Sequence, residues 1–508
     1  MRRVAIFPSG WHNGPRPTMP LYVTAAHDIF VGALLLLTYG SVSLVAVQGG
    51  LQIVGALLPK RPPRRSARPR TGFVSIHVPT CNEPPVLLKN TLRSLHGLRH
   101  GDFEVIVLDN NTADPAVWRP IQAYCKELGA PFRFYHVDKL SGFKAGALNL
   151  LREKTDPRAE FIAVVDADYE VQPDFLTEAL RYFSDERVAF VQFPQTYQNI
   201  GSGNRGLRIE YEHFFQNYLN AGNRFGCVTA TGTLTVFRAA VLRHVGPYTP
   251  TSMTEDAEMG ARLFFAGYRG VFVDRVMGRG VMPYDFVAYK KQKKRWARGN
   301  MEVLMRRFTD IVFPSDLSWA QKLALLSQLG AWTNFTLLPS LCIVAFSLAE
   351  MAGIGEGRFT ERIILVSAAA LAIHVATKTV AFGLLFHGRY SWTDILRALA
   401  VHFGMNWTYA TALFLGVFRL GGKFERTNKF IIPRVPPAVE HSIFEIGMSI
   451  VSAVLGMIAV AEGRPAIAAA AVLVFALHAS VVMVDAETRF TKRVSAMLLK
   501  ELETRTRL

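Results

Sequence analysis

Long apolar runs at both ends of this sequence limit what it can fold into. Residues 29–58 form a nearly uncharged run, two more runs lie within residues 323–386, and two lie within residues 444–484. A helix needs about 20 apolar residues to cross the hydrocarbon core of a bilayer, and these runs are close to that length. The sequence therefore predicts a membrane protein with five transmembrane helices, and 50% of its 508 residues are hydrophobic, as such a protein requires.

A basic segment after the first apolar run indicates how the chain is oriented. Residues 59–71 are rich in Lys and Arg, and such linkers stay on the cytoplasmic side of a membrane. We therefore expect an N-terminal tail at residues 1–28 to lie outside and residues 485–508 to form a cytoplasmic tail. The first run begins too late and is too long for a cleaved signal peptide, so we interpret it as an uncleaved anchor.

The formal net charge of +17 is compatible with several classes of partner. Nucleic acid is one, but no recognition motif for it is present, and much of the positive charge lies beside the apolar runs. Anionic lipid headgroups explain that distribution better. The four cysteines lie far apart without metal-site spacing, which argues against a zinc site and against a disulfide framework.

Residues 72–315 contain no run of membrane length and have the pattern of an α/β domain. Segments typical of buried strands, at residues 73–79, 103–109, 132–137 and 161–165, alternate with helical segments. Open α/β sheets bind their ligands at the carboxyl ends of the strands. We therefore expect a functional site at that edge.

Charged side chains follow three of these strands. Asp166 and Asp168 follow the fourth, and residues two apart in an extended chain share one face. Such a pair suits a divalent cation that carries phosphates, although a solvated turn is its commoner context. Asp109 ends the second strand, where a carboxylate often meets a nucleotide, and Lys144 follows the third in a segment that either approaches a phosphate or starts a helix.

Three carboxylates open a later helix. Glu255, Asp256 and Glu258 follow Thr254, and acidic side chains are stabilised at the positive end of a helix. A carboxylate held at the rim of a cleft can instead act as the general base that deprotonates an incoming hydroxyl. The residues alone leave both interpretations open.

The α/β region ends in a strongly basic helix. Gln292, Arg295 and Trp296 stand at positions i, i+3 and i+4, so one helical face carries an amide, a guanidinium and an indole. A basic helix on a membrane surface is the simpler interpretation. A tryptophan among lysines and arginines also suits a platform on which the apolar face of a sugar stacks.

The segment at residues 391–436 is ambiguous. Residues 391–420 are numerous enough to cross a membrane but include Asp394, Arg397 and His402. A crossing would also place the basic C-terminal tail on the wrong side. We therefore expect an interfacial helix here, followed by a cytoplasmic stretch close to the α/β domain.

Five motifs stand in one order along the chain: Asp109, Lys144-Ala-Gly146, Asp166-Ala-Asp168, Thr254-Glu255-Asp256 and Gln292-Lys-Lys-Arg295-Trp296. In this order and spacing they resemble the processive membrane glycosyltransferases of family 2, and cellulose synthase catalytic subunits in particular. The resemblance covers residues 73–429. It implies an α/β fold: a GT-A-type nucleotide-sugar domain, a mostly parallel sheet with flanking helices, inserted between transmembrane helices.

The resemblance implies roles for the carboxylates. Asp109 and Asp166 would contact the uridine of a UDP-sugar. Asp168 would hold the Mg²⁺ or Mn²⁺ that bridges the diphosphate. Asp256 would be the catalytic base, with Glu255 beside it as a second catalytic residue.

It also implies residues that bind substrate. Glu83, in the turn after the first strand, and Lys144 would contact the donor. Gln292, Arg295 and Trp296 would bind the pyrophosphate and the acceptor end of a glycan.

A gating loop that closes over the nucleotide is expected from the same resemblance, with Thr427 and Lys429 as substrate-binding residues. Two positions depart from the family pattern. Asn110 stands where the family often has a second aspartate, and Arg426 stands where cellulose synthases usually carry valine. Other family 2 synthases share that form of the loop, so the sugar is left open.

The resemblance implies a metal-dependent and processive transfer. The transfer should also invert the configuration of the sugar, because one base is present and no nucleophile is evident. A sugar, glucose first, would pass from a UDP-sugar to the non-reducing end of a growing β-glycan. Export of that polysaccharide through the inner (plasma) membrane would accompany the transfer, with the catalytic domain cytoplasmic. Periplasmic or accessory export subunits are candidate partners, and nucleic acid is not.

Three alternatives stay open on the sequence. The first is a chitin- or hyaluronan-like synthase that uses UDP-GlcNAc. The second is the transfer of a single sugar to a lipid acceptor, and the third is a membrane protein without catalytic activity.

Overall fold

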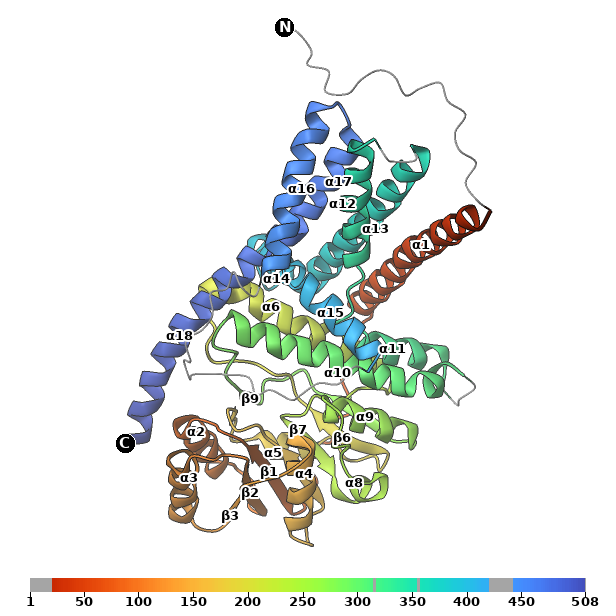
Figure 1. Ribbon diagram of the computed structural model, residues 1–508. Coiled ribbons are helices and arrows are strands. Elements are labelled where there is room, and N and C mark those ends of the chain that lie inside the picture. The colour runs from red at the N-terminus through yellow and green to blue at the C-terminus, as the bar shows by residue number, and fades with distance from the viewer. Residues whose placement is uncertain (1–20, 314–316, 354–356, 420–441, 508) are drawn as a thin grey trace, which may run out of the picture.

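The computed structural model describes residues 21–313, 317–353, 357–419 and 442–507. An α/β domain lies at one end of the molecule and a group of long helices at the other, with α6 (Arg205–His213), α10 (Phe286–Val312) and α15 (Asn406–Val417) between them (Figure 1). The expected fold class, an α/β domain inserted between apolar helices, is confirmed.

The domain is built on a seven-stranded sheet of order β3-β2-β1-β4-β7-β6-β8. One strand, β7, runs antiparallel to both neighbours, while the remaining pairs are parallel. The strands are β1 (Val74–Thr80), β2 (Phe103–Asn110), β3 (Phe132–Val137), β4 (Phe161–Val164), β6 (Val188–Gln192), β7 (Thr235–Arg238) and β8 (Arg269–Phe272). A separate pair joins β5 (Glu170–Val171) to β9 (Gly278–Arg279).

Helices cover both faces of the sheet, which explains why its strands are apolar throughout rather than alternating. Ile106 and Leu108 of β2 belong to a buried cluster that includes α4 (Phe143–Lys154). Val105 and Val107 point to the other face, where the cluster includes α2 (Pro85–His96) and α3 (Pro115–Leu128). A strand that is buried on both sides is typical of a parallel sheet.

Among the described residues, four helical stretches are long and apolar enough to cross a membrane. They are α1 (Leu21–Leu57), α13 (Arg358–Phe386), α16 (Ile443–Ala461), and α17 (Pro465–Ala479) with its continuation α18 (Val481–Arg507). The expected C-terminal tail is thus largely helical. Glu487 of α18 accepts hydrogen bonds from the backbone N–H groups of Gly206 and Leu207, so α18 is fixed to the start of α6.

The single span expected over residues 323–348 differs from the structure, which has two shorter helices there. They are α11 (Trp319–Leu329) and the apolar α12 (Leu337–Met351). The turn between them is polar: Asn334 accepts a hydrogen bond from the backbone N–H of Thr336 and donates one to Asn406. Gln48 of α1 donates a hydrogen bond of 2.9 Å to the carbonyl of Thr333 in the same turn.

The ambiguous segment also consists of two helices, α14 (Trp392–Phe403) and α15, of 12 residues each. At 1.5 Å per residue each is about 18 Å long, which is too short to cross a hydrocarbon core. The first packs on α6 and the second on α10. Both therefore connect the apolar helices to the α/β domain.

Candidate active site

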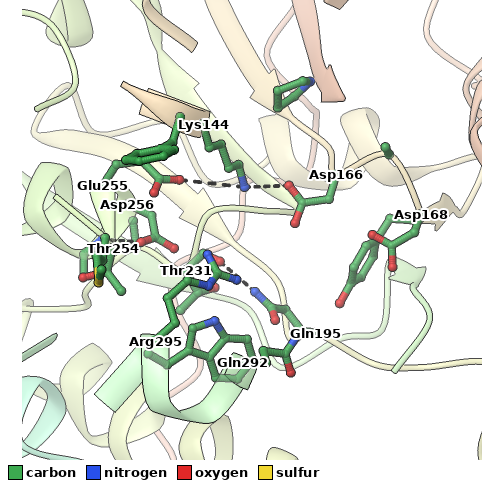
Figure 2. A pocket seen from close by; sticks show the side chains of 18 of the residues that line it. Lys144, Asp166, Asp168, Gln195, Thr231, Thr254, Glu255, Asp256, Gln292 and Arg295 are labelled. Carbon is green, nitrogen blue, oxygen red and sulfur yellow. Dashed lines mark hydrogen bonds and ion pairs between the residues drawn. The ribbon is translucent and has the colours of Figure 1, made fainter. Parts of the chain in front are cut away.

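A cleft of about 260 Å³ opens at the carboxyl ends of β1, β2 and β4 and extends to α10. Most of the residues singled out from the sequence line it, although they come from elements far apart in the chain (Figure 2). They are Glu83, Lys144, Asp166, Asp168, Glu255, Asp256, Gln292, Arg295 and Trp296.

Backbone contacts fix the two aspartates that follow β4. The backbone N–H of Asp166 donates a 3.0 Å hydrogen bond to Oγ1 of Thr233, and that of Tyr169 donates to the Asp166 carbonyl. The backbone N–H of Val281 donates a 3.0 Å hydrogen bond to Oδ2 of Asp168. Both side chains line the cleft as predicted, although residues 166–169 form a turn and not the extended chain on which the prediction was based.

An ammonium group lies between the acidic groups of the cleft. Nζ of Lys144, at the start of α4, is 2.6 Å from Oδ1 of Asp166 and 3.9 Å from Oε1 of Glu255. Burial opposes its charge, but these carboxylates and Asp256 hold the pKa of Lys144 above its ordinary value. Lys144 therefore links Asp166, after β4, to Glu255, which lies on a helix much later in the chain (Figure 2).

Glu255 and Asp256 begin α9 (Glu255–Phe265) and face the cleft. Burial and the neighbouring Asp256 raise the pKa of Glu255 to about 7, and burial raises the pKa of Asp256 against the effect of Lys144. Oδ1 of Asp256 accepts a 2.8 Å hydrogen bond from the backbone N–H of Ala257. A carboxylate with a raised pKa can take a proton from a hydroxyl near neutral pH.

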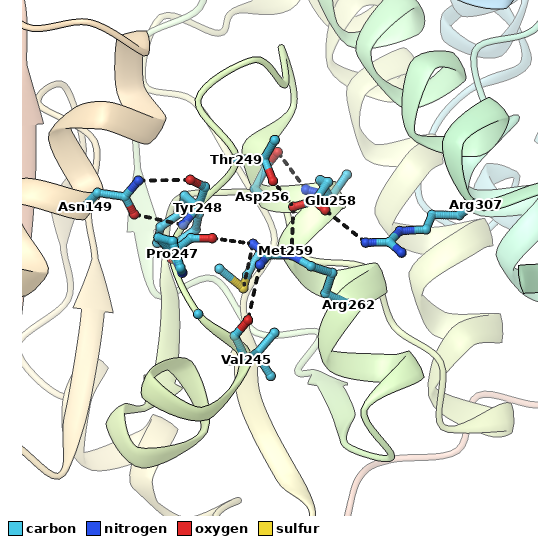
Figure 3. A network of polar contacts seen from close by, with 12 residues as sticks. Asn149, Val245, Pro247, Tyr248, Thr249, Asp256, Glu258, Met259, Arg262 and Arg307 are labelled. Atoms are coloured by element: carbon cyan, nitrogen blue, oxygen red, sulfur yellow. Dashed lines mark hydrogen bonds and ion pairs between the residues drawn. The ribbon is translucent and has the colours of Figure 1, made fainter.

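The third acid of this helix anchors it instead. Glu258 accepts hydrogen bonds from Oγ1 of Thr249 and Nε of Arg262, both at 3.0 Å, and from Arg307 of α10 at 3.3 Å (Figure 3). Glu258 therefore has a structural role at the start of the helix, while Glu255 and Asp256 line the cleft.

Helix α10 presents Gln292, Arg295 and Trp296 to the cleft from one face, as their spacing predicts. The indole of Trp296 lies beside Tyr211 of α6 and Trp332 of the turn after α11, with ring centroids 5.8 and 6.0 Å away. We call Tyr211, Trp296 and Trp332 the aromatic wall. The Tyr211 hydroxyl donates a hydrogen bond to Oε1 of Gln292, which fixes that amide against the wall.

Two glycines allow the close approaches that the cleft requires. A Cβ atom at Gly299 of α10 would lie 2.6 Å from Cγ2 of Thr254, so α10 packs directly against the start of α9. Gly232 has a φ of +83°, and a Cβ atom there would lie 2.6 Å from Oδ2 of Asp256 and 3.3 Å from Nζ of Lys144. The backbone at Gly232 thus forms the surface against which Asp256 lies.

Asp109 is placed differently from the other predicted residues. It is buried and does not line the cleft, where the neighbouring Asn110 and Asn111 appear instead. Its carboxylate accepts hydrogen bonds of 2.8 Å from Thr112 and His136, and burial raises its pKa. Thr427 and Lys429 lie outside the described residues.

Sequence reasoning missed several residues of the cleft, above all Tyr197, Tyr211, Phe214 and Trp332. An aromatic-rich stretch over residues 211–218 is a signal that could have identified two of them. Trp332 has no such signal, because it follows an apolar segment and reaches the cleft only through tertiary packing.

The oxygen atoms that line the cleft fit a cation that is bound partly by the protein and partly by the phosphates of a substrate. Within the described ranges, no group of three or more His, Cys, Asp or Glu side chains could hold a metal ion by itself. Asp166 and Asp168 offer hard carboxylate oxygens at one side of the cleft. Mg²⁺ typically binds to one or two carboxylates together with the phosphates of a substrate, and these residues suit that arrangement.

Comparison with protein families gives two matches. The model described as Glycosyl transferase family group 2 matches residues 161–417, which is half of the chain. The model described as Glycosyl transferase family 2 matches residues 75–246. Together they cover the α/β domain and the helices that complete the cleft.

Comparison with individual proteins gives more distant similarities. A UDP-forming cellulose synthase catalytic subunit from Dictyostelium discoideum is 31% identical over 201 residues, which are 39% of this chain and 18% of that protein. A probable glucomannan 4-beta-mannosyltransferase of rice (Oryza sativa) is 26% identical over 264 residues, which are 50% of this chain and 45% of that protein. The matched region thus spans less than half the length of these relatives.

Among solved structures, the chain is similar to a mannosyltransferase from Pyrobaculum calidifontis in complex with GDP-Man and Mn²⁺. The identity is 18%, the TM-score is 0.49, and the match covers 78% of this chain and 99% of that one. A likeness at this level says nothing about the substrate of this chain.

Proposed function

This chain belongs to glycosyl transferase family group 2 and is a glycosyltransferase, and on that premise we propose that it extends a β-glycan. The sugar, which we take to be glucose, would pass from a UDP-sugar to the non-reducing end of the growing chain. Synthesis would be processive, and the polymer would leave through the membrane helices.

One observation carries this proposal: a carboxylate suited to act as a base lies in the same cleft as the aspartates and the aromatic wall. The part of the cleft that is lined by Asp166 and Asp168 suits a nucleoside diphosphate with its cation. The aromatic wall suits a sugar ring, whose apolar face stacks on indole and phenol rings. Asp256 lies near Lys144, which in turn contacts Asp166, so the base would be close to the donor.

The reaction follows from this arrangement. The carboxylate of Asp256 takes the proton of the acceptor hydroxyl, and the hydroxyl oxygen forms a bond to the anomeric carbon of the donor. The bond from that carbon to the diphosphate oxygen breaks in the same step, so the configuration inverts and an α-linked donor gives a β-linkage. The guanidinium of Arg295 offsets negative charge on the departing UDP. A Mg²⁺ or Mn²⁺ ion held by Asp168 would supply further positive charge there.

We also propose that the catalytic domain lies in the cytoplasm and that the protein resides in the inner membrane. The basic linker at residues 59–71 supports this, because it joins α1 to the α/β domain. The donor side of the cleft would then face the compartment in which nucleotide sugars are made. The described part of the chain offers apolar helices for the membrane and a separate polar domain for catalysis.

A second donor class deserves the same test, because the relatives include glucomannan 4-beta-mannosyltransferases. Their names favour mannosyl transfer to a β-linked glycan as the second candidate. The experiment is to offer the detergent-solubilised full chain UDP-glucose, UDP-GlcNAc and GDP-mannose with Mg²⁺ or Mn²⁺ and to measure nucleotide release. Products are then digested with linkage-specific glycosidases.

UDP release from UDP-glucose, with a polymer that a β-glucanase degrades, would support the proposal. Release of GDP from GDP-mannose would move the function to the second candidate. An α-linked product would contradict the inverting mechanism for every donor.

The rate should depend on pH through Glu255 and Asp256. Burial raises the pKa of both carboxyl groups, to about 7 for Glu255, so each takes up a proton as the pH falls, and a protonated Asp256 cannot act as a base. We expect kcat to fall as the pH drops through the pKa of Asp256, with a limiting slope of about tenfold per pH unit. The Glu255→Gln variant should remove any part of this decline near pH 7 that comes from Glu255 and keep the part that comes from Asp256. A kcat that does not fall at low pH would contradict the role of Asp256 as the base.

Replacing Gly232 with alanine should impair catalysis by displacing Asp256. The φ of +83° strains any side chain there by roughly 1–2 kcal/mol, and the new Cβ atom would overlap Oδ2 of Asp256. We expect kcat to fall at least about tenfold, measured as nucleotide release. Gly246→Ala is the matched control, because Gly246 has a φ of +95° and nothing within 4 Å of the added atom. It should lose stability alone, and equal losses of kcat would contradict the steric argument.

A further inference from the structure

A buried ion pair lies directly behind the aromatic wall. Nζ of Lys293, on α10, is 2.6 Å from Oε2 of Glu210, on α6, and the two side chains are 0% and 2% exposed. The hydroxyls of Tyr289 and Tyr409 donate 3.0 Å hydrogen bonds to the two oxygens of Glu210. Two helices of the catalytic region and α15 thus meet at one carboxylate.

The ammonium of Lys293 also touches every member of the aromatic wall. It lies 3.8 Å from the ring centroid of Tyr211, 4.3 Å from that of Trp332 and 5.1 Å from that of Trp296. A cation that is desolvated among aromatic rings is attracted to their faces. Lys293 therefore joins three rings from three separate segments into one unit.

A buried ion pair is weak evidence for stability, because removing both charges from water costs much of what their attraction returns. The location of this pair indicates another role. Stacking of a sugar requires rings that already stand in the right orientation, and Tyr211 also orients the amide of Gln292.

We propose that Lys293 and Glu210 are positioning residues that hold the aromatic wall and Gln292 in the arrangement that binds the acceptor sugar. This inference rests on the proposed function, because it assigns the acceptor to the aromatic wall. Neither residue touches the donor side, so the pair acts on acceptor binding and leaves donor binding unchanged.

The same helix offers a matched control. Lys290 of α10 forms an ion pair of 2.5 Å with Glu445 of α16, and its side chain is 10% exposed against 1% for Glu445. Its ammonium lies over the ring of Phe286, and neither Lys290 nor Glu445 lines the cleft. Loss of this pair removes a comparable buried interaction without touching the aromatic wall.

The test compares Lys293→Met, Glu210→Gln, the double variant and Lys290→Met in the full chain. The acceptor is a soluble β-linked gluco-oligosaccharide, and KM is measured separately for acceptor and donor. We expect Lys293→Met to raise the acceptor KM about 10- to 100-fold and to leave the donor KM within about twofold of wild type. The double variant leaves no uncompensated charge and should fold better, but its acceptor KM should stay raised, because it restores no cation to the rings. Lys290→Met should change thermal stability alone.

An unchanged acceptor KM in Lys293→Met, an equal rise in the donor KM, or the same rise in Lys290→Met would overturn the inference while the proposed function stands. If Lys293→Met does not fold, the acceptor KM and the donor KM are compared in the double variant and in Glu210→Gln instead. If wild type turns over no donor, the proposed function fails, and oligosaccharide quenching of tryptophan fluorescence replaces KM. Quenching that is lost in Lys293→Met and kept in Lys290→Met supports the inference, and any other pattern, including none in wild type, overturns it.

Discussion

Replacing Asp256 with asparagine is expected to lower kcat for sugar transfer by about 10²–10⁴-fold, the usual contribution of a general base. The amide keeps the size of the side chain and can still accept the hydrogen bond from the backbone N–H of Ala257. The acceptor proton, however, has no group to receive it. Donor KM should stay within about threefold of wild type, because Asp256 lies on the far side of Lys144 from Asp166.

The control for this variant is Glu258→Gln on the same helix. Glu258 does not line the cleft, and an amide oxygen can still accept from Thr249 and Arg262, while the amide NH₂ group would lose the hydrogen bond from Arg307. Thermal stability should therefore fall while kcat stays within about threefold of wild type. If Asp256→Asn keeps more than about a tenth of wild-type kcat, Asp256 is not the base and Glu255 becomes the candidate.

Asp168→Asn is expected to have the second large effect, through the divalent cation. An amide oxygen is a weaker ligand than a carboxylate, so the Mn²⁺ concentration for half-maximal activity should rise at least about tenfold. With the cation bound less well, kcat at ordinary metal concentrations should fall about 10²–10³-fold, which excess Mn²⁺ partly restores. The measurement is nucleotide release as a function of Mn²⁺ concentration, after chelation of all divalent ions.

Asp174→Asn serves as its control. Asp174 is close in sequence but forms an ion pair of 2.8 Å with Arg275 and does not line the cleft. Its metal dependence should match wild type. Wild-type activity that survives complete chelation would show that no divalent cation is needed.

The parts of the site that the sequence predicted are those fixed by local geometry. Asp166 and Asp168 follow the carboxyl end of β4, and Gln292, Arg295 and Trp296 share one helical face. The first result needs only the place where a strand ends, and the second needs only the period of a helix.

The parts that escaped prediction depend on tertiary contacts. Strand β7 has four residues and runs against its neighbours, and no turn signal announces that reversal. Asp109 is the second-last residue of β2, one residue before the strand ends, yet hydrogen bonds from Thr112 and His136 hold it away from the cleft. The break between α11 and α12 depends on distant partners, because Gln48 donates a hydrogen bond to the carbonyl of Thr333 and Asn334 donates one to Asn406.

The turn that carries Trp332 has a further consequence, for attempts to excise the α/β domain as a soluble fragment. Gln48 of α1 binds this turn from one side and Asn406 of α15 from the other, so the wall of the cleft is completed by residues outside the domain. A fragment ending before α11 would retain the carboxylates but lose Trp332 and Tyr409. On the proposed function, such a fragment would keep the groups assigned to the donor and the base but lose part of the wall assigned to the acceptor, so we expect it to serve for studies of donor binding and not of sugar transfer.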